Sequence, residues 1–237
     1  MIKQHLYKHF LLLLLVILFP AALFSQIDID SIKLALREAG NEKKAPILIK
    51  LSNEYKIVSQ KLSLKYGHEA LAYSLKFKND PNTALAYKTI GIQHYYYRQI
   101  DSAIHYNLLA LEKYKQIEDL SGVGKTLNNL GVFYSNIGLY KKSIEYHLQS
   151  LEIKENLNDT TGIAYSYNNI GTLYYQFKNF DSALQYYSKA LKMSVDISDE
   201  TGKQSALSNI GLIYSDQHKY KEALIVLNEA LDINHRL

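Results

Sequence analysis

The feature that most constrains this chain is an internal repeat of fixed period. Segments that begin at Asp119, Asp159 and Asp199 align with one another, which is a 40-residue step, and two series of glycines keep the same step. These series are Gly122, Gly162 and Gly202, and Gly91, Gly131, Gly171 and Gly211. A fixed period between about 20 and 50 residues predicts a solenoid, in which each unit buries its apolar face against its neighbours.

Each copy has the pattern of two helices. In the copy that begins at Asp159, apolar residues across 163–177 recur at steps of four and three, which is one face of a helix. A second face follows across 183–195, and the residues KNFD separate the two. We expect Asp181 to cap the second helix. The small side chain at Gly171 indicates that the helices approach closely there, which offsets the cost of about 1 kcal/mol of a mid-helix glycine.

This pattern resembles the tetratricopeptide repeat. The resemblance rests on an apolar residue followed by Gly, a Tyr three residues later, and small residues in the second helix. These residues are Ile90-Gly91, Leu130-Gly131, Ile170-Gly171 and Ile210-Gly211; Tyr134, Tyr174 and Tyr214; and Ala103, Ala110, Ser143, Ser150, Ala183, Ala190, Ala223 and Ala230. The chain departs from the family in three ways: His94 stands where later copies have Tyr, the closing proline is missing, and the step is longer than the usual value of about 34.

The resemblance implies an all-α fold, a right-handed superhelical α-solenoid of about five helix pairs. We expect the pairs at roughly 41–78, 79–118, 119–158, 159–198 and 199–237, behind a leading helix at 26–40 capped by Asp30 or Ser31.

The N-terminus has a different character. Lys3 and Lys8 precede the apolar run FLLLLLVILFPAALF, the arrangement of a signal peptide. We predict that residues 1–25 direct export, most simply to a bacterial periplasm, with an uncleaved membrane anchor as the alternative. The chain has no cysteine, which excludes disulfides, a lipoprotein anchor and thiolate metal sites. A formal net charge of +4 gives no basic footprint for nucleic acid.

One short stretch, GVGKT at residues 122–126, is close to a phosphate-binding loop. That motif requires a glycine at position 119, where this chain has Asp119, and a preceding β-strand, where this chain has a helical pattern. The equivalents of Lys125 in later copies are Tyr165 and Ser205. We therefore interpret these residues as an ordinary turn and helix start.

No catalytic arrangement is evident, and we expect a protein that is not an enzyme and holds neither cofactor nor metal. The histidines lie in different copies at no ligand spacing. Short pairings such as Glu145-Tyr146-His147 are interpreted as solvated helix surface.

The stronger functional signal is asparagine just before the apolar-Gly step. In the family that this chain resembles, the first helices line a concave groove, and asparagines at this point often hydrogen-bond the backbone of a bound peptide. Carried over, the predicted groove residues are Asn129, Asn169, Asn209, Asn128, Asn168, Tyr95, Tyr175, Lys125 and Tyr165, with Val132, Thr172, Leu212, Ser135 and Ser215 beside them. The alternative is that the amides bond between neighbouring helices and bind no ligand.

The resulting hypothesis is an exported scaffold that binds a protein or peptide without catalysis. The rival is the sensor portion of a bacterial signalling protein, of histidine kinase or transcription-regulator type, whose output domain is absent from this chain. Leu224, Leu227 and Leu231 are expected to be partly uncovered on the last helix. That exposure suggests a homodimer, a docking partner or a C-terminal extension.

Overall fold

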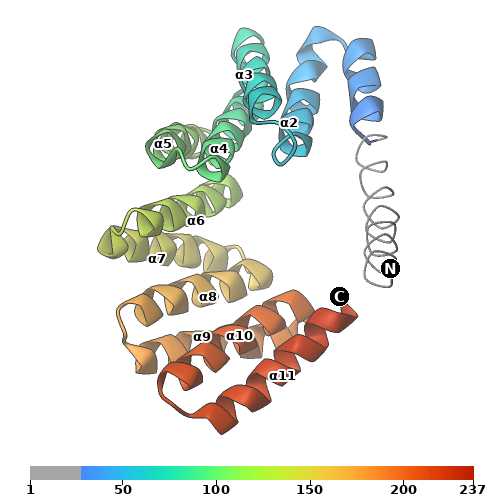
Figure 1. Ribbon diagram of the computed structural model, residues 1–237. Coiled ribbons are helices and arrows are strands. Elements are labelled where there is room, and N and C mark those ends of the chain that lie inside the picture. Colours follow the sequence, from blue (N-terminus) through green and yellow to red (C-terminus); the bar gives the residue numbers. More distant parts are fainter. Residues whose placement is uncertain (1–27) are drawn as a thin grey trace, which may run out of the picture. The chain divides into compact units, whose positions relative to one another are not determined.

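The computed structural model describes residues 28–237, and every regular element in that range is a helix (Figure 1). The predicted signal segment, 1–25, lies outside the described residues. Residues 28–38 are helical, as expected for the leading helix. Asp30 and Ser31 are not its cap, because the helix already includes residue 28.

The chain divides into two compact units, and the first runs up to Tyr97. After the leading helix it contains η1 (Asn41–Lys43), α2 (Lys44–Glu54), α3 (Gln60–Lys76) and α4 (Asp80–Tyr96). Its core forms where α2 packs against α3 and α4, around Leu48, Ile49 and Ala70.

The second unit, Arg98–Leu237, holds the regular repeats. Its helices are α5 (Ile100–Gln116), α6 (Leu120–Asn136), α7 (Tyr140–Asn156), α8 (Thr160–Gln176), α9 (Phe180–Asp196), α10 (Glu200–Asp216) and α11 (Tyr220–Arg236). Each helix packs against the next one along the chain (Figure 1). The predicted all-α solenoid of helix pairs is confirmed.

The turns explain the repeat period. Helices α3 to α11 each have 17 residues, and three-residue turns join them, so that two helices and two turns make one copy. The middle residue of every turn has positive φ: Lys78, Arg98, Glu118, Gly138, Asn158, Lys178, Ser198 and His218. In seven of these turns the residue after it donates its amide back into the preceding helix, as Asp159 N does to Lys154 O at 2.9 Å. This is the Schellman way of ending a helix, and only Gly138 adopts it without a Cβ penalty.

Side-chain caps begin many of these helices. The carboxylates of Asp119, Asp159 and Asp199 accept hydrogen bonds from Gly122, Gly162 and Gly202, at 2.8, 2.9 and 3.0 Å. Asp119, which occupies the glycine position of the phosphate-loop motif, is thus the N-cap of α6.

The predicted cap of α9 was wrong. Asn179, and not Asp181, accepts the hydrogen bond from Ser182 N at 3.1 Å. The helix begins at Phe180, directly after a turn centred on Lys178, so Asp181 falls inside its first turn.

Mid-helix glycines lie where a second helix presses on the first, as predicted. A Cβ at Gly171 would lie 2.7 Å from the ring of Tyr187, and a Cβ at Gly131 would lie 2.6 Å from His147 Nε2. Both distances are well inside van der Waals contact, so each glycine makes room for a ring from its partner helix.

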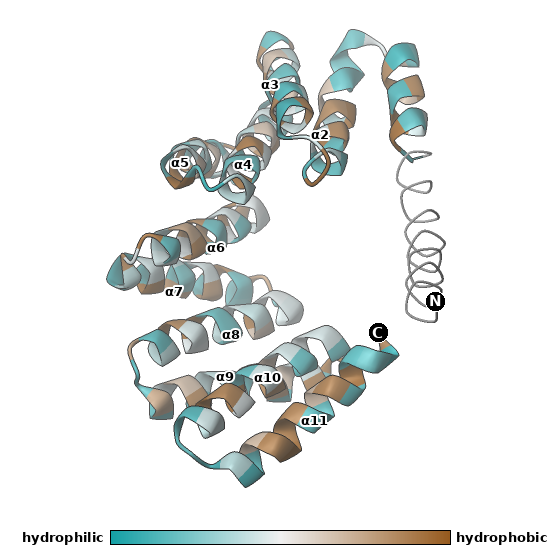
Figure 2. Ribbon diagram, viewed as in Figure 1, coloured by the Kyte–Doolittle hydropathy of each residue, from teal (hydrophilic) through white to brown (hydrophobic). Residues whose placement is uncertain are grey.

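The last helix, α11, exposes apolar side chains, as the sequence led us to expect. Leu224 is 62% exposed and Leu231 is 51% exposed. Their counterparts one repeat earlier, Leu184 and Leu191, pack into a core cluster with residues of α10. Figure 2 shows hydrophobic residues running along α11.

Candidate functional site

The predicted asparagines form hydrogen bonds from one repeat to the next. Asn169 Nδ2 donates to Asn128 Oδ1 at 3.0 Å, and Asn209 Nδ2 donates to Asn168 Oδ1 at 3.0 Å. The second asparagine of one copy thus bonds to the first asparagine of the copy before it. The repeat period produces this asparagine ladder, because it returns the same amide to the same face of α6, α8 and α10.

The first hydrogen bond of the ladder differs, since Asn129 Nδ2 donates to Asn107 Oδ1 of α5, at 3.3 Å. The ladder is the inter-helix arrangement that the sequence left open as an alternative. Each bond uses one N–H of a carboxamide that also carries a second N–H and an oxygen with two lone pairs. Because these side chains are only partly buried, the ladder leaves them able to meet a ligand. Their role in peptide binding stays a prediction.

The predicted groove tyrosines make comparable links. Tyr175 Oη donates to Asp216 Oδ2 at 2.8 Å, and that hydrogen bond, with burial and the carboxylate charge, raises the pKa of Tyr175. Tyr165 is 41% exposed on α8, and its pKa is raised by burial and by Asp199. Tyr95 belongs to the first unit, where it meets Tyr96 edge to face.

Lys125 is exposed on α6. The structure therefore brings the asparagines and Tyr175 to the first helices of successive repeats, α6, α8 and α10, while Lys125 and Tyr165 carry no ladder bond.

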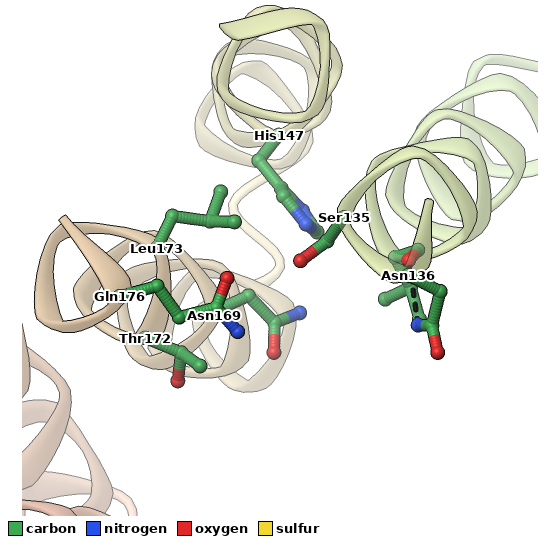
Figure 3. A pocket seen from close by; sticks show the side chains of 8 residues that line it. Ser135, Asn136, His147, Asn169, Thr172, Leu173 and Gln176 are labelled. Carbon is green, nitrogen blue, oxygen red and sulfur yellow. Dashed lines mark hydrogen bonds between the residues drawn. The ribbon is translucent and has the colours of Figure 1, made fainter. Parts of the chain in front are cut away.

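A cavity of about 220 Å³ opens between α6, α7 and α8, beside the ladder (Figure 3). Its lining side chains are Val132, Ser135, Asn136, His147, Asn169, Thr172, Leu173 and Gln176. Asn169 belongs to both the ladder and the cavity. Among the described residues, no acidic side chain, lysine or arginine lines it.

His147 is the residue that sequence reasoning missed. It was expected at a solvated surface, but it is 2% exposed, and its Nδ1 is buried without a hydrogen-bond partner. Burial, and secondarily the positive charge of Lys154, lowers the pKa of His147 to about 4. The imidazole is therefore neutral at physiological pH. The missed signal is the repeat register, which places His147 where the next copy has Tyr187, a residue assigned to the packing face.

Equivalent positions in neighbouring copies show what His147 lacks. Asn107 donates to Ala103 O at 3.0 Å and accepts the bond from Asn129. Tyr187 Oη donates to Thr172 Oγ1 at 3.1 Å. The residue in the place of Thr172 beside His147 is Val132, whose side chain has no polar group. The last copy has the apolar Leu227 at this register, so His147 is the polar residue of the series whose buried Nδ1 has no partner.

A second buried ionisable group, Lys154, is satisfied internally. Its Nζ donates to Ser166 Oγ at 2.8 Å, and burial lowers its pKa to about 8, against the opposing effect of Asp159. Within residues 28–237, no cluster of His, Cys, Asp or Glu fits a metal ion. No helix in that range is long and apolar enough to cross a membrane.

Comparison with known families supports the repeat assignment. Residues 122–194 and residues 204–237 match family models described as tetratricopeptide repeat. No curated protein matches the sequence.

Solved structures share the fold at low sequence identity. The chain is similar to BtubC (BKLC) from P. vanneervenii, with a TM-score of 0.75 and 17% identity over 90% of this chain and 89% of that one. A signal transduction ATPase (STAND) protein with a tetratricopeptide repeat sensor, from Pyrococcus horikoshii, matches with a TM-score of 0.74 and 21% identity. That match covers 84% of this chain but 32% of the other. A Rap protein complexed with competence and sporulation factor matches with a TM-score of 0.66 and 16% identity, over 88% and 69%.

Proposed function

We propose that this chain is a non-catalytic scaffold that binds an extended peptide or protein segment along the asparagine ladder. The observation that carries the proposal is the recurrence of partly exposed carboxamides on α6, α8 and α10 at the repeat period. A peptide backbone presents N–H and C=O groups in alternation, and a carboxamide can both donate and accept. The Rap protein of the comparison, which shares this fold, was solved in complex with competence and sporulation factor.

The ladder also pre-organises those amides. Each asparagine is held by its neighbour in the preceding copy, so a ligand need not immobilise freely rotating side chains. Binding to side chains that are already ordered avoids a cost of about 0.5–1.5 kcal/mol for each one.

The test is selection of random peptides displayed on phage against residues 28–237, followed by affinity measurement with the triple variant N129A/N169A/N209A. If each amide contributes about 1 kcal/mol, we expect affinity to fall roughly 100-fold. The matched control is N156A/N228A, which removes exposed carboxamides from second helices. Unchanged affinity in the triple variant, with its thermal midpoint retained, would show that the ladder does not bind peptide.

We further propose that the chain acts after export, on the strength of the N-terminal basic and apolar segments. A sensor role is the second candidate, supported by the likeness to the repeat sensor of the STAND protein. Fractionation of the native organism and intact mass of the product separate the two. A mass near 24–27 kDa in the soluble exported fraction supports a free scaffold, by comparison with the 27.2 kDa of this sequence. A much larger membrane-bound product supports the sensor.

A further inference from the structure

We propose that the cavity beside His147 is a subsite for one uncharged, hydrogen-bonding side chain of the bound peptide, a carboxamide or a hydroxyl. This inference rests on the proposed function and adds a sequence preference to it. Three observations carry it: the size of the cavity, the chemistry of its lining, and the neutral imidazole of His147 in that lining.

The cavity is large enough for a ligand group. A water molecule occupies about 30 Å³ of liquid, so about 220 Å³ holds several waters or one side chain of medium size. Its position suits a peptide held by the ladder, because Asn169 contributes to both. A backbone bonded at Asn169 would place a neighbouring side chain near the space that Figure 3 shows between Ser135, Leu173 and Asn169.

The lining selects against ionised side chains. Six of its eight side chains are polar, namely Ser135, Asn136, His147, Asn169, Thr172 and Gln176, and the other two are Val132 and Leu173. His147 is neutral, so the cavity lining contains no charge to pair with a carboxylate or an ammonium group. Desolvating an unpaired charge is far more costly than desolvating an amide or a hydroxyl. A purely apolar side chain would form no hydrogen bond with the polar part of the lining.

The imidazole of His147 supplies the specific contact. A neutral imidazole has one donor nitrogen and one acceptor nitrogen. Buried polar groups are normally paired, and Tyr187 shows that this position can be paired within the protein. The unpaired Nδ1 is itself buried, so a ligand in the cavity meets the part of the ring that lines the cavity. A ligand amide or hydroxyl, which can donate or accept, matches that neutral ring in either tautomer.

The first experiment uses three capped amino acids as probes of nearly equal size: N-acetyl-L-glutamine amide, N-acetyl-L-glutamate amide and N-acetyl-L-methionine amide. The readout is the pair of ring ¹⁵N signals of His147 in residues 28–237, assigned with H147N. We expect the glutamine probe to shift these signals at three- to tenfold lower concentration than the other two, since one hydrogen bond separates them. Equal concentrations for all three probes would overturn the subsite.

The second experiment narrows the cavity with residues that the protein already uses at the same register. V132T/H147Y rebuilds beside Gly131 the arrangement of Thr172, Tyr187 and Gly171, and it leaves every asparagine of the ladder in place. We expect the glutamine probe to lose its binding, and selected peptides to bind at least tenfold more weakly than they bind the unmodified protein.

The outcomes separate the two proposals. If the selected peptides bind N129A/N169A/N209A more weakly but bind V132T/H147Y normally, the subsite proposal is wrong and the groove proposal is supported. Selection that yields no peptide at all, while the glutamine probe still shifts His147, would overturn the groove and with it the assignment of the cavity to a peptide side chain.

Discussion

The positions of His147 and Tyr187 make the most informative comparison in this protein. Both lie at the same register of a second helix, both are almost fully buried, and both place a ring over a mid-helix glycine. Tyr187 reaches the hydroxyl of Thr172. His147 is smaller, lines a cavity together with Val132, and has an unpaired, buried Nδ1.

The repeat therefore sets the position of a possible site, and the side chains at positions 132 and 147 differ from those at 172 and 187 in what they offer there. Backbone geometry is nearly the same in the two copies, because turns and helix lengths are the same. Where Tyr187 meets the hydroxyl of Thr172, the smaller His147 has Val132 at the equivalent position and borders a polar cavity.

The largest expected difference is in acid sensitivity. The folded pKa of His147 is about 4, below the ordinary value of 6.5, because of burial and of Lys154. α6 and α8 contribute only uncharged side chains around it. The unfolded state therefore binds the extra proton first, so the contribution of His147 is complete above pH 6.5 and is lost as the pH falls toward 4. We expect a loss of about 3 kcal/mol in the free energy of unfolding.

The measurement is urea denaturation at pH 7 and at pH 4 for the unmodified protein and for H147N, which carries the residue of position 107. The carboxylates titrate alike in both proteins, so the difference between their pH dependences isolates His147. Parallel curves would contradict the buried, neutral imidazole.

The next prediction compares the stabilities of alanine variants at Gly171 and Gly131. In G171A the new methyl would meet the ring of Tyr187, which is packed on all sides, and we expect a loss of about 1–3 kcal/mol in unfolding free energy. In G131A the ring of His147 has the cavity to move into, and the helix gains about 1 kcal/mol in propensity, so the net change should be near zero. Chemical denaturation of both variants checks this. Equal losses of unfolding free energy would show that the ring of His147 does not move into the cavity.

The third prediction concerns a substitution that makes the Tyr187 repeat resemble the His147 repeat. T172V removes the acceptor of the Tyr187 hydroxyl, and an unpaired buried hydroxyl should cost about 1–2 kcal/mol. The shift in denaturation midpoint measures this. T172S, which keeps a hydroxyl, is the control and should lose clearly less. Equal losses in the two variants would show that the hydrogen bond contributes little.

The smallest effect is expected when the His147 repeat is given the two residues of the Tyr187 repeat. V132T/H147Y should gain roughly 0.5–1 kcal/mol, because a larger ring fills the cavity and acquires a partner. Thermal unfolding of this variant beside V132T alone gives the comparison. A double variant less stable than V132T would mean that α7 cannot carry a tyrosine as α9 does.

Much of the fold was accessible from the sequence, because the fixed repeat period, the glycines before Tyr and the small residues of second helices all indicate helix pairs. The starts of helices were harder. Asp181 looked like a cap, but the left-handed residue at Lys178 sets the beginning of α9, so Asn179 caps it. The candidate site was also predicted only in part. The asparagines could be picked from their register, whereas His147 was interpreted as surface because its own stretch, read alone, is polar.

The sequence by itself determined the repeat, its helices and the face on which the asparagines recur, since these depend on a local periodicity that every copy contains. Only the tertiary structure decided that Asn169 bonds to Asn128, that His147 is buried, and that a cavity lies beside it. Those facts depend on which side chains of different helices meet and on how completely their volumes fill the space between α6, α7 and α8. No single segment contains that information.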